Sequence, residues 1–247
     1  MTHRFIGKFP LEAKQFWIAD RELAHQVKDV LRLQTGEQII LSDGLGQEAE
    51  AEIVSLDKEA VEVRILAVNQ SSKEPKTKVI LYLAILKKEN FDLAVQKAVE
   101  VGVSKIVPLI SGRTVKLGLK RDRLQKIIKE ASEQSGRSVL PELEEEINFK
   151  EALVHAKVND FNIFFNLGAK SLSLLKKDLP SKILRGKTSE GEGKSIGIFI
   201  GPEGGWKDAE VESAKAAKFV LAGLGNLTLR AETAAIVAVY EVISNLG

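Results

Sequence analysis

IGIFIGPEGGW, residues 196–206, joins a run of β-branched and aromatic residues to a glycine-rich turn. Residues 196–200 predict a buried strand, and a helix is expected to follow from Asp208. Because glycines lack a Cβ atom, the loop at 201–205 can bring its backbone close to a ligand. A strand, a glycine loop and a helix in this order are typical of a small-molecule site in an α/β protein, although a plain tight turn can have the same residues.

The composition is that of an ordinary globular protein and excludes several kinds of site. The 247 residues are 44% hydrophobic and 28% charged, and this length suits one large domain or two smaller ones. The chain has no cysteine, which excludes disulfides, thiolate catalysis and cysteine metal sites. Its histidines, His3, His25 and His155, are far apart in the sequence, so we expect no metal, although carboxylates alone could also bind one.

Hydropathy and charge point to a cytoplasmic protein without a membrane partner. The longest apolar run, 79–86, is far shorter than the ~20 residues of a membrane helix, and the first ten residues lack the apolar core of a signal peptide. The net charge of +2 does not by itself indicate a nucleic-acid partner. Residues 113–137, however, contain eight Lys and Arg against three acids, which indicates either a solvated face or a phosphate-contacting surface.

Residues 1–70 are predicted to form a small β-rich domain. Strands are expected at 37–41, 48–56 and 60–68, and a short helix at 25–31. Asp43-Gly44 and Asp57-Lys58 supply turn residues between the strands. The polar stretch 69–77 contains a proline and has no apolar periodicity, so we place the domain boundary there and assign 71–77 to a linker.

After the linker, strands and helices alternate, which predicts a mostly parallel α/β sheet in residues 78–247. The run 79–86 is apolar throughout, as expected of a strand that is covered on both faces. Further strands are expected at 105–110, 161–167, 196–200 and 219–222. Helices are expected at 90–101, 124–135, 148–157, 172–176, 208–217 and 231–245, with Asn90 and Asn148 as N-caps. Residues 185–195 are predicted to form a surface loop.

Three of the predicted strands run into loops that contain glycine, at 166–168, 201–205 and 223–230. In a parallel sheet these loops all lie at the carboxyl edge, where α/β proteins bind ligands. None has the Gly-Lys-Ser/Thr of a Walker A motif, and the second strand that a dinucleotide fingerprint at Gly223 requires does not follow. We therefore expect a ligand pocket in the last third of the chain that is not an ordinary dinucleotide site.

Short motifs occur along nearly the whole chain. The last third contains GPEGG at 201–205, Leu224-Gly225 and LRAETA at 229–234. Others are His3-Arg4-Phe5 and Val30-Leu31-Arg32 near the start, and QKA at 96–98, Gly102-Val103 and EASEQSGR at 130–137 in the middle. In these motifs the chain resembles the RsmE-type 16S ribosomal RNA uridine-N3 methyltransferases of the SPOUT superfamily. Asn226 and Thr228 depart from the pattern of the family. The motifs cover nearly the whole chain, and together they are much more specific than any one of them.

The resemblance implies a PUA-like RNA-binding β-barrel domain at 1–70, followed by a SPOUT α/β domain at 78–247 with a deep trefoil knot at about 161–247. It also implies that the chain binds S-adenosyl-L-methionine as methyl donor and forms a homodimer whose active site includes residues from both subunits. The implied reaction is methylation of N3 of a specific uridine, position 1498 in the family, in the 16S rRNA of the small ribosomal subunit.

The resemblance also assigns roles to individual residues. Arg230 is expected to be the cation beside the uridine, because the dipole of the last helix disfavours an arginine there without another use. Glu232 suits that dipole by itself and could be a cap, a loop anchor or a catalytic group. RNA contacts are expected from Arg4, Arg32, Arg113, Gln134 and Arg137. Cofactor contacts, largely through the backbone, are expected from Leu167, Gly168, Ile200, Gly201, Glu203, Gly204, Gly205, Leu221, Leu224, Gly225, Leu227 and Leu229.

Two other interpretations stay open from the sequence. The chain could be a SPOUT methyltransferase that acts on a different RNA, which mapping of lost N3-methyluridine would reveal. It could also be a noncatalytic RNA-binding protein of ribosome assembly, as the β-rich domain and the basic stretch would allow. Failure to bind S-adenosylmethionine would favour the second alternative.

Overall fold

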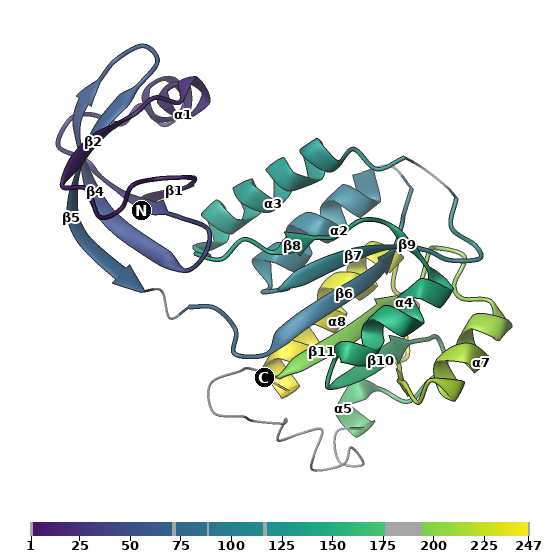
Figure 1. Ribbon diagram of the computed structural model, residues 1–247. Coiled ribbons are helices and arrows are strands. Elements are labelled where there is room, and N and C mark those ends of the chain that lie inside the picture. The colour runs from purple at the N-terminus through teal and green to yellow at the C-terminus, as the bar shows by residue number, and fades with distance from the viewer. Residues whose placement is uncertain (1, 71–72, 88, 116–117, 176–193, 247) are drawn as a thin grey trace. The chain divides into compact units, whose positions relative to one another are not determined.

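A computed structural model describes residues 2–70, 73–87, 89–115, 118–175 and 194–246 of the chain. The chain folds into two compact units, which are coloured along the sequence in Figure 1. The first unit contains Met1–Glu74 and Ser132–Leu140, and the second contains Pro75–Ala131 and Pro141–Gly247. The part of the predicted surface loop at 185–193 lies outside the described residues, and so does part of the range of the predicted knot, which stays a prediction.

The first unit is built on a five-stranded sheet with the order β1-β3-β4-β5-β2. The strands are β1 (His3–Ile6), β2 (Gln15–Ile18), β3 (Gln38–Ser42), β4 (Gln47–Leu56) and β5 (Val61–Gln70). β1 pairs with β3 in parallel, and the other pairs are antiparallel. The strands expected at 37–41, 48–56 and 60–68 are confirmed as β3, β4 and β5. β1 and β2 were not predicted, because four residues are too few to show a clear alternation.

The helical segment of this unit begins earlier than expected. α1 (Arg21–His25) continues directly into the π-helical turn η1 (Gln26–Val30), whereas the sequence predicted a helix at 25–31. The start is set by Asp20, whose side chain accepts hydrogen bonds from the backbone N–H groups of Glu22 and Leu23. Leu23 and Val27 are buried against the sheet residues Ile39, Leu41, Ile53 and Val63.

Residues 132–140 belong to the first unit through contacts that are distant in sequence. Leu45 and Val139 form an isolated antiparallel bridge, and the hydroxyl of Ser42 donates to the carbonyl oxygen of Ser138 over 3.1 Å. The backbone N–H of Ile6 donates to the carboxylate of Glu133 over 2.8 Å. The unit therefore includes a segment that a boundary at residue 70 leaves out.

The second unit contains a seven-stranded sheet with the order β12-β10-β11-β6-β7-β8, and β9 also pairs with β7. Its pairings are all parallel, which confirms the predicted α/β class. The strands are β6 (Lys78–Ala84), β7 (Lys105–Ile110), β8 (Glu142–Leu143), β9 (Ile147–Asn148), β10 (Phe161–Phe165), β11 (Ser195–Ile200) and β12 (Val220–Ala222). The helices are α2 (Glu89–Glu100), α3 (Arg121–Ser135), α4 (Phe149–His155), α5 (Leu172–Leu175), α7 (Asp208–Ala216) and α8 (Ala231–Leu246), with a 3-10 turn at η2 (Ala156–Val158).

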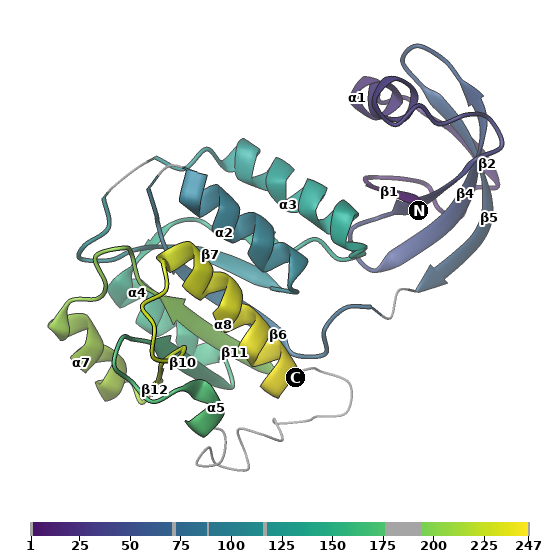
Figure 2. The ribbon, with the colours of Figure 1, turned by 180° about the vertical axis from the view of Figure 1, so that it is seen from behind.

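Helices cover both faces of this sheet, and β6 contributes to both cores. Val79, Leu81 and Leu83 pack with α2, α3 and α8, which lie in front of the sheet in Figure 2. Ile80 and Tyr82 face the opposite way and pack with α4 and α7. This double burial explains why β6 is apolar throughout, since neither face of the strand meets water.

Tyr82 brings a hydroxyl into the second of these cores. Its ring stacks on Phe199 with centroids 4.2 Å apart. The hydroxyl shares a 2.9 Å hydrogen bond with Nδ1 of His155 and accepts one of 3.3 Å from the amide of Asn159. Burial raises the pKa of Tyr82 to about 12, because the low-dielectric core disfavours the phenolate.

Candidate functional site

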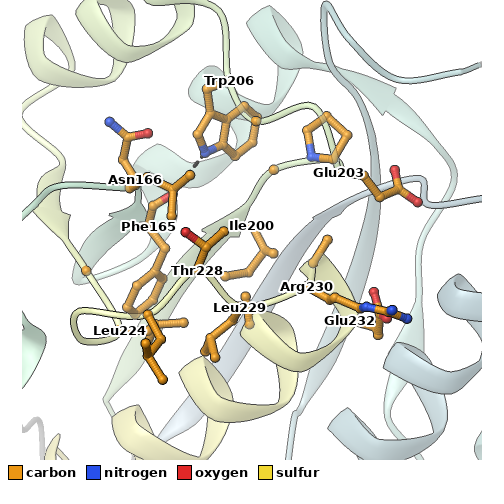
Figure 3. Close-up of a pocket in the computed structure, with 18 of the residues that line it drawn as sticks. Phe165, Asn166, Ile200, Glu203, Trp206, Leu224, Thr228, Leu229, Arg230 and Glu232 are labelled. Atoms are coloured by element: carbon orange, nitrogen blue, oxygen red, sulfur yellow. Dashed lines mark hydrogen bonds between the residues drawn. The ribbon is translucent and has the colours of Figure 1, made fainter.

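The three glycine-containing loops meet at the carboxyl edge of the sheet, as predicted. They follow β10, β11 and β12, which are neighbours in the strand order. Together with the turn between β6 and α2 and the start of α8, they enclose a pocket of about 550 Å³, shown in Figure 3. This volume lies in the range of about 300–1,000 Å³ that is typical of small-molecule sites. The pocket lies entirely within the second unit.

Two glycines meet conformational demands that other residues would not. A Cβ atom at Gly223 would collide with the backbone carbonyl oxygen of Ala169, so the loops after β12 and β10 touch backbone to backbone. Gly205 has φ +70° and donates its N–H to the carbonyl of Pro202 over 2.8 Å, which closes the tight turn after β11. The pocket walls are therefore made of closely packed main chain.

The loop at 201–205 is anchored on three sides. The buried indole of Trp206 donates from Nε1 to the carbonyl of Phe165, the last residue of β10, over 2.9 Å. Oε1 of Glu203 accepts from the backbone N–H of Lys87 over 2.9 Å. The guanidinium of Arg113 donates to the carbonyl of Gly204 over 2.6 Å. These bonds connect the loop to β10, to the turn after β6 and to the loop after β7.

The pocket has an apolar side and a polar side. In Figure 3, Phe165, Leu224 and Leu229 lie on one side, whereas Glu203, Arg230 and Glu232 lie on the other. Lys87 and Asn90 add further polar groups to the lining. An arrangement of this kind can hold a flat apolar group in one half and charged or hydrogen-bonding groups in the other.

Glu232 and Arg230 differ sharply in their environment. Arg230 is exposed, whereas Glu232 is only 6% exposed and lies in the first turn of α8. Oε2 of Glu232 is buried and has no hydrogen-bond partner among the residues that the structure describes. Leaving a buried oxygen unpaired is costly, and Glu232 is one of the residues that line the pocket.

Most of the residues predicted for the cofactor line the pocket. They are Leu167, Gly168, Ile200, Gly201, Glu203, Gly205, Leu224, Gly225, Leu227 and Leu229, and Arg230 and Glu232 line it as well. Gly204 and Leu221 are not in the lining. Leu221 packs instead against the core on the α4 and α7 side of the sheet.

The sequence did not point to the turn between β6 and α2. Asn90 was expected to be the N-cap of α2, but the helix already includes Glu89, and the side chain of Asn90 lines the pocket with Lys87. The only available signal was that this turn follows a strand of the same parallel sheet. Four other lining residues, Asn166, Pro202, Gly223 and Thr228, lie within the three predicted loops, whereas Phe165, Trp206, Ala231 and Ala234 lie outside them and were not predicted.

The residues predicted to contact RNA fall into two groups. The guanidinium of Arg4 is buried and pairs with Glu48 over 2.8 Å, and the side chain of Arg137, 8% exposed, pairs with Glu74 over 2.7 Å. Both of these ion pairs lie inside the first unit. The remaining three, Arg32, Gln134 and Arg113, are exposed.

Neither a metal cluster nor a membrane-spanning helix is present in the part of the chain that the structure describes. No group of three or more His, Cys, Asp or Glu side chains is arranged to hold a metal ion. No helix in these residues combines the length and the apolar character that crossing a membrane requires.

Comparison with known proteins links both units to RNA methylation. Residues 72–243 match a family model described as an RNA methyltransferase domain, and residues 20–66 match an RNA methyltransferase PUA domain. The ribosomal RNA small subunit methyltransferase E of Rickettsia conorii is 34% identical over 243 residues, covering 96% of this chain and 93% of the relative. Its counterpart in Bacillus subtilis is 31% identical over 245 residues, which cover 94% of this chain and 90% of the relative.

Solved structures resemble the chain over its whole length. The ribosomal RNA small subunit methyltransferase E of Neisseria gonorrhoeae, bound to S-adenosylmethionine, aligns with a TM-score of 0.83 at 29% identity and covers 99% of this chain and 98% of its own. A methyltransferase of Legionella pneumophila in complex with the same cofactor aligns with a TM-score of 0.82 at 30% identity, covering 99% and 97%.

Proposed function

The chain belongs to the family of ribosomal RNA small subunit methyltransferases E, and we propose that it methylates N3 of a specific uridine in 16S rRNA with S-adenosylmethionine as donor. The observation that carries the proposal is the pocket at the carboxyl edge, because its walls are the three loops after β10, β11 and β12. Relatives that align over nearly the whole chain were solved with S-adenosylmethionine bound.

The residues of the pocket suit S-adenosylmethionine. Its adenosine would lie against the apolar side formed by Phe165, Leu224 and Leu229, with backbone groups of the loops as hydrogen-bond partners. Close packing at Gly223 and the turn at Gly205 hold these backbone groups in place. The bound molecule would supply a methyl group activated by a sulfonium sulfur. Methyl transfer needs the nucleophile in line with that group, so positioning is the main contribution of the protein.

Arg230 is the residue we assign to the uridine. N3 of uridine is a poor nucleophile until its proton leaves, and the resulting anion spreads its charge over O2 and O4. A cation at the edge of the base stabilises this charge as it develops. Arg230 is exposed at the polar side of the pocket, where a nucleotide that enters from solvent would meet its guanidinium.

RNA binding is proposed for exposed basic and polar groups of each unit. Arg113 lies beside the cofactor loop through its bond to Gly204, and its position suits a phosphate contact. Arg32 and Gln134 are the exposed candidates of the first unit. We further propose that the protein acts as a homodimer in the cytoplasm, with residues from both copies completing the active site.

Mapping modified nucleotides in a strain that lacks the protein tests this function. Loss of one N3-methyluridine from 16S rRNA, restored by the intact gene, is the expected result. Loss of a mark from another RNA would show a different substrate. If every mark persists and calorimetry detects no binding of S-adenosylmethionine, the chain is a noncatalytic RNA-binding protein.

A further inference from the structure

The buried carboxyl group of Glu232 has no structural role that the contacts of the described residues explain. Glu232 is one of the residues that line the pocket, it is more than nine-tenths buried, and its Oε2 lacks a hydrogen-bond partner among the described residues. Burying an acceptor without a partner is unfavourable, because it loses its hydrogen bonds to water and gains none in the protein. Groups that bear such a cost collect at functional sites, where a ligand or a reaction uses them.

Glu232 lies in the first turn of α8, which spans Ala231–Leu246, where the unpaired N–H groups of the helix N-terminus produce a positive potential. The second carboxylate of the pocket, Glu203, is already engaged, because its Oε1 accepts from the backbone N–H of Lys87. Of these two carboxylates, Glu232 is therefore the one whose buried oxygen has no donor among the described residues and could accept a proton.

We propose that Glu232 is the general base that removes the N3 proton of the target uridine. This inference rests on the proposed function, which requires that proton to leave before N3 can act as a nucleophile. Uracil presents one donor, N3–H, between two carbonyl acceptors. An unpaired carboxylate oxygen matches the donor, and cationic or amide groups such as those of Arg230, Lys87 and Asn90 match the carbonyls.

Proton removal and methyl transfer are separate steps. The in-plane electron pair of N3 that holds the proton is the same pair that attacks the methyl carbon, so the proton must leave first. Oε2 of Glu232 takes the proton, and the electron pair of the N–H bond stays on nitrogen. Arg230 stabilises the uracil anion while the uracil ring turns its N3 toward the methyl group. N3 then bonds to the methyl carbon as the carbon–sulfur bond breaks and its electron pair goes to sulfur. Glu232 finally releases the proton to water.

The competing use of this oxygen is to bind a donor group of the cofactor, such as its α-ammonium. The two uses differ in what Glu232→Gln changes. Glutamine keeps the size of the side chain but cannot accept a proton at neutral pH. If Glu232 acts as the base, water or hydroxide can remove the N3 proton in its place once N3 ionises more readily. If Glu232 instead binds the cofactor, easier ionisation of N3 does not restore the lost contact.

The test compares Glu232→Gln with the unaltered protein and with Glu241→Gln, which removes the same charge from the opposite end of α8, away from the pocket lining. Thermal unfolding checks the fold, and calorimetry measures S-adenosylmethionine affinity. Single-turnover methylation is followed from about pH 6 to about pH 9 on two RNAs, one with uridine and one with 5-fluorouridine at the target, whose N3 loses its proton more readily. Glu232→Asp, which keeps the carboxyl group, is measured in parallel.

Glu232→Gln should bind the cofactor within about twofold of the unaltered protein and methylate uridine roughly 10²- to 10⁴-fold more slowly. The deficit should shrink as the pH rises and should largely disappear with 5-fluorouridine, and Glu232→Asp should keep the original pH profile. A deficit that is equal at every pH and on both RNAs, an equally large loss of cofactor affinity, or unchanged activity overturns the proposal. If Glu232→Gln does not fold, an altered pH profile in Glu232→Asp overturns it. If the unaltered protein methylates a position other than N3, the proposed function fails as well, so the two failures are distinguishable.

Discussion

Replacing Trp206 with phenylalanine should weaken both the second unit and its binding of S-adenosylmethionine. The indole is 7% exposed, its ring lies 4.5 Å from that of Phe164, and its N–H bonds to the carbonyl of Phe165 over 2.9 Å. Phenylalanine retains part of the aromatic packing but has no donor. The carbonyl of Phe165 then loses this buried donor, at about 1–3 kcal/mol, and the smaller ring adds about 1 kcal/mol for the space it leaves.

We therefore expect the free energy of unfolding to fall by about 2–4 kcal/mol in urea titrations followed by circular dichroism. Because the bond joins two walls of the pocket, a loss of about 1.4 kcal/mol in their positioning would weaken cofactor affinity about tenfold by calorimetry. Trp17→Phe is the matched control, since Trp17 is 48% exposed in the first unit and should cost less than about 0.5 kcal/mol. If both variants unfold alike and bind the cofactor equally, Trp206 does not hold the pocket together.

Four further substitutions test other parts of the molecule. Arg230→Ala should abolish methylation while calorimetry still shows cofactor binding, and retained activity would remove Arg230 from catalysis. Arg113→Ala should weaken RNA binding and lower the slope of its salt dependence by about 1. Arg137→Ala should lower the free energy of unfolding in urea by about 3 kcal/mol, because Glu74 loses its cationic partner and keeps the backbone N–H groups of Ser138 and Val139; equal stability of the two variants would contradict this. Because the pKa of Tyr82 is raised by burial to about 12, the stability associated with its neutral form is complete below about pH 10 and should be lost toward pH 12. Tyr82→Phe should remove this part of the pH dependence, and an unchanged alkaline unfolding curve would refute it.

Local patterns predicted most of the elements of the second unit. The strand expected at 105–110 is β7 with the same bounds, and the expected cap Asn148 does accept a hydrogen bond from the N–H of Glu151. Such features depend on neighbours in sequence, through side-chain alternation, capping and glycine turns. The short strands β1 and β2 lacked that local signal.

The order of the strands was not available from local patterns. β6 lies directly beside β11, and this adjacency brings Lys87 and Asn90 to the pocket, although more than 100 residues separate them from Gly201–Gly205. Local patterns also do not reveal the partner of Arg137, which the basic stretch predicts to be a surface cation. Its ion pair with Glu74 forms only when residues 132–140 pack into the first unit.

The sequence by itself determined the α/β class of the second unit, the three glycine loops at its carboxyl edge and the resemblance to a methyltransferase family. These follow from periodicity, glycine placement and motifs, all of which are properties of short stretches. The tertiary structure alone decided that Glu232 lines the pocket and that its buried Oε2 has no partner among the described residues. Burial and hydrogen-bond satisfaction depend on which distant segments surround a side chain, so no local pattern could have shown them.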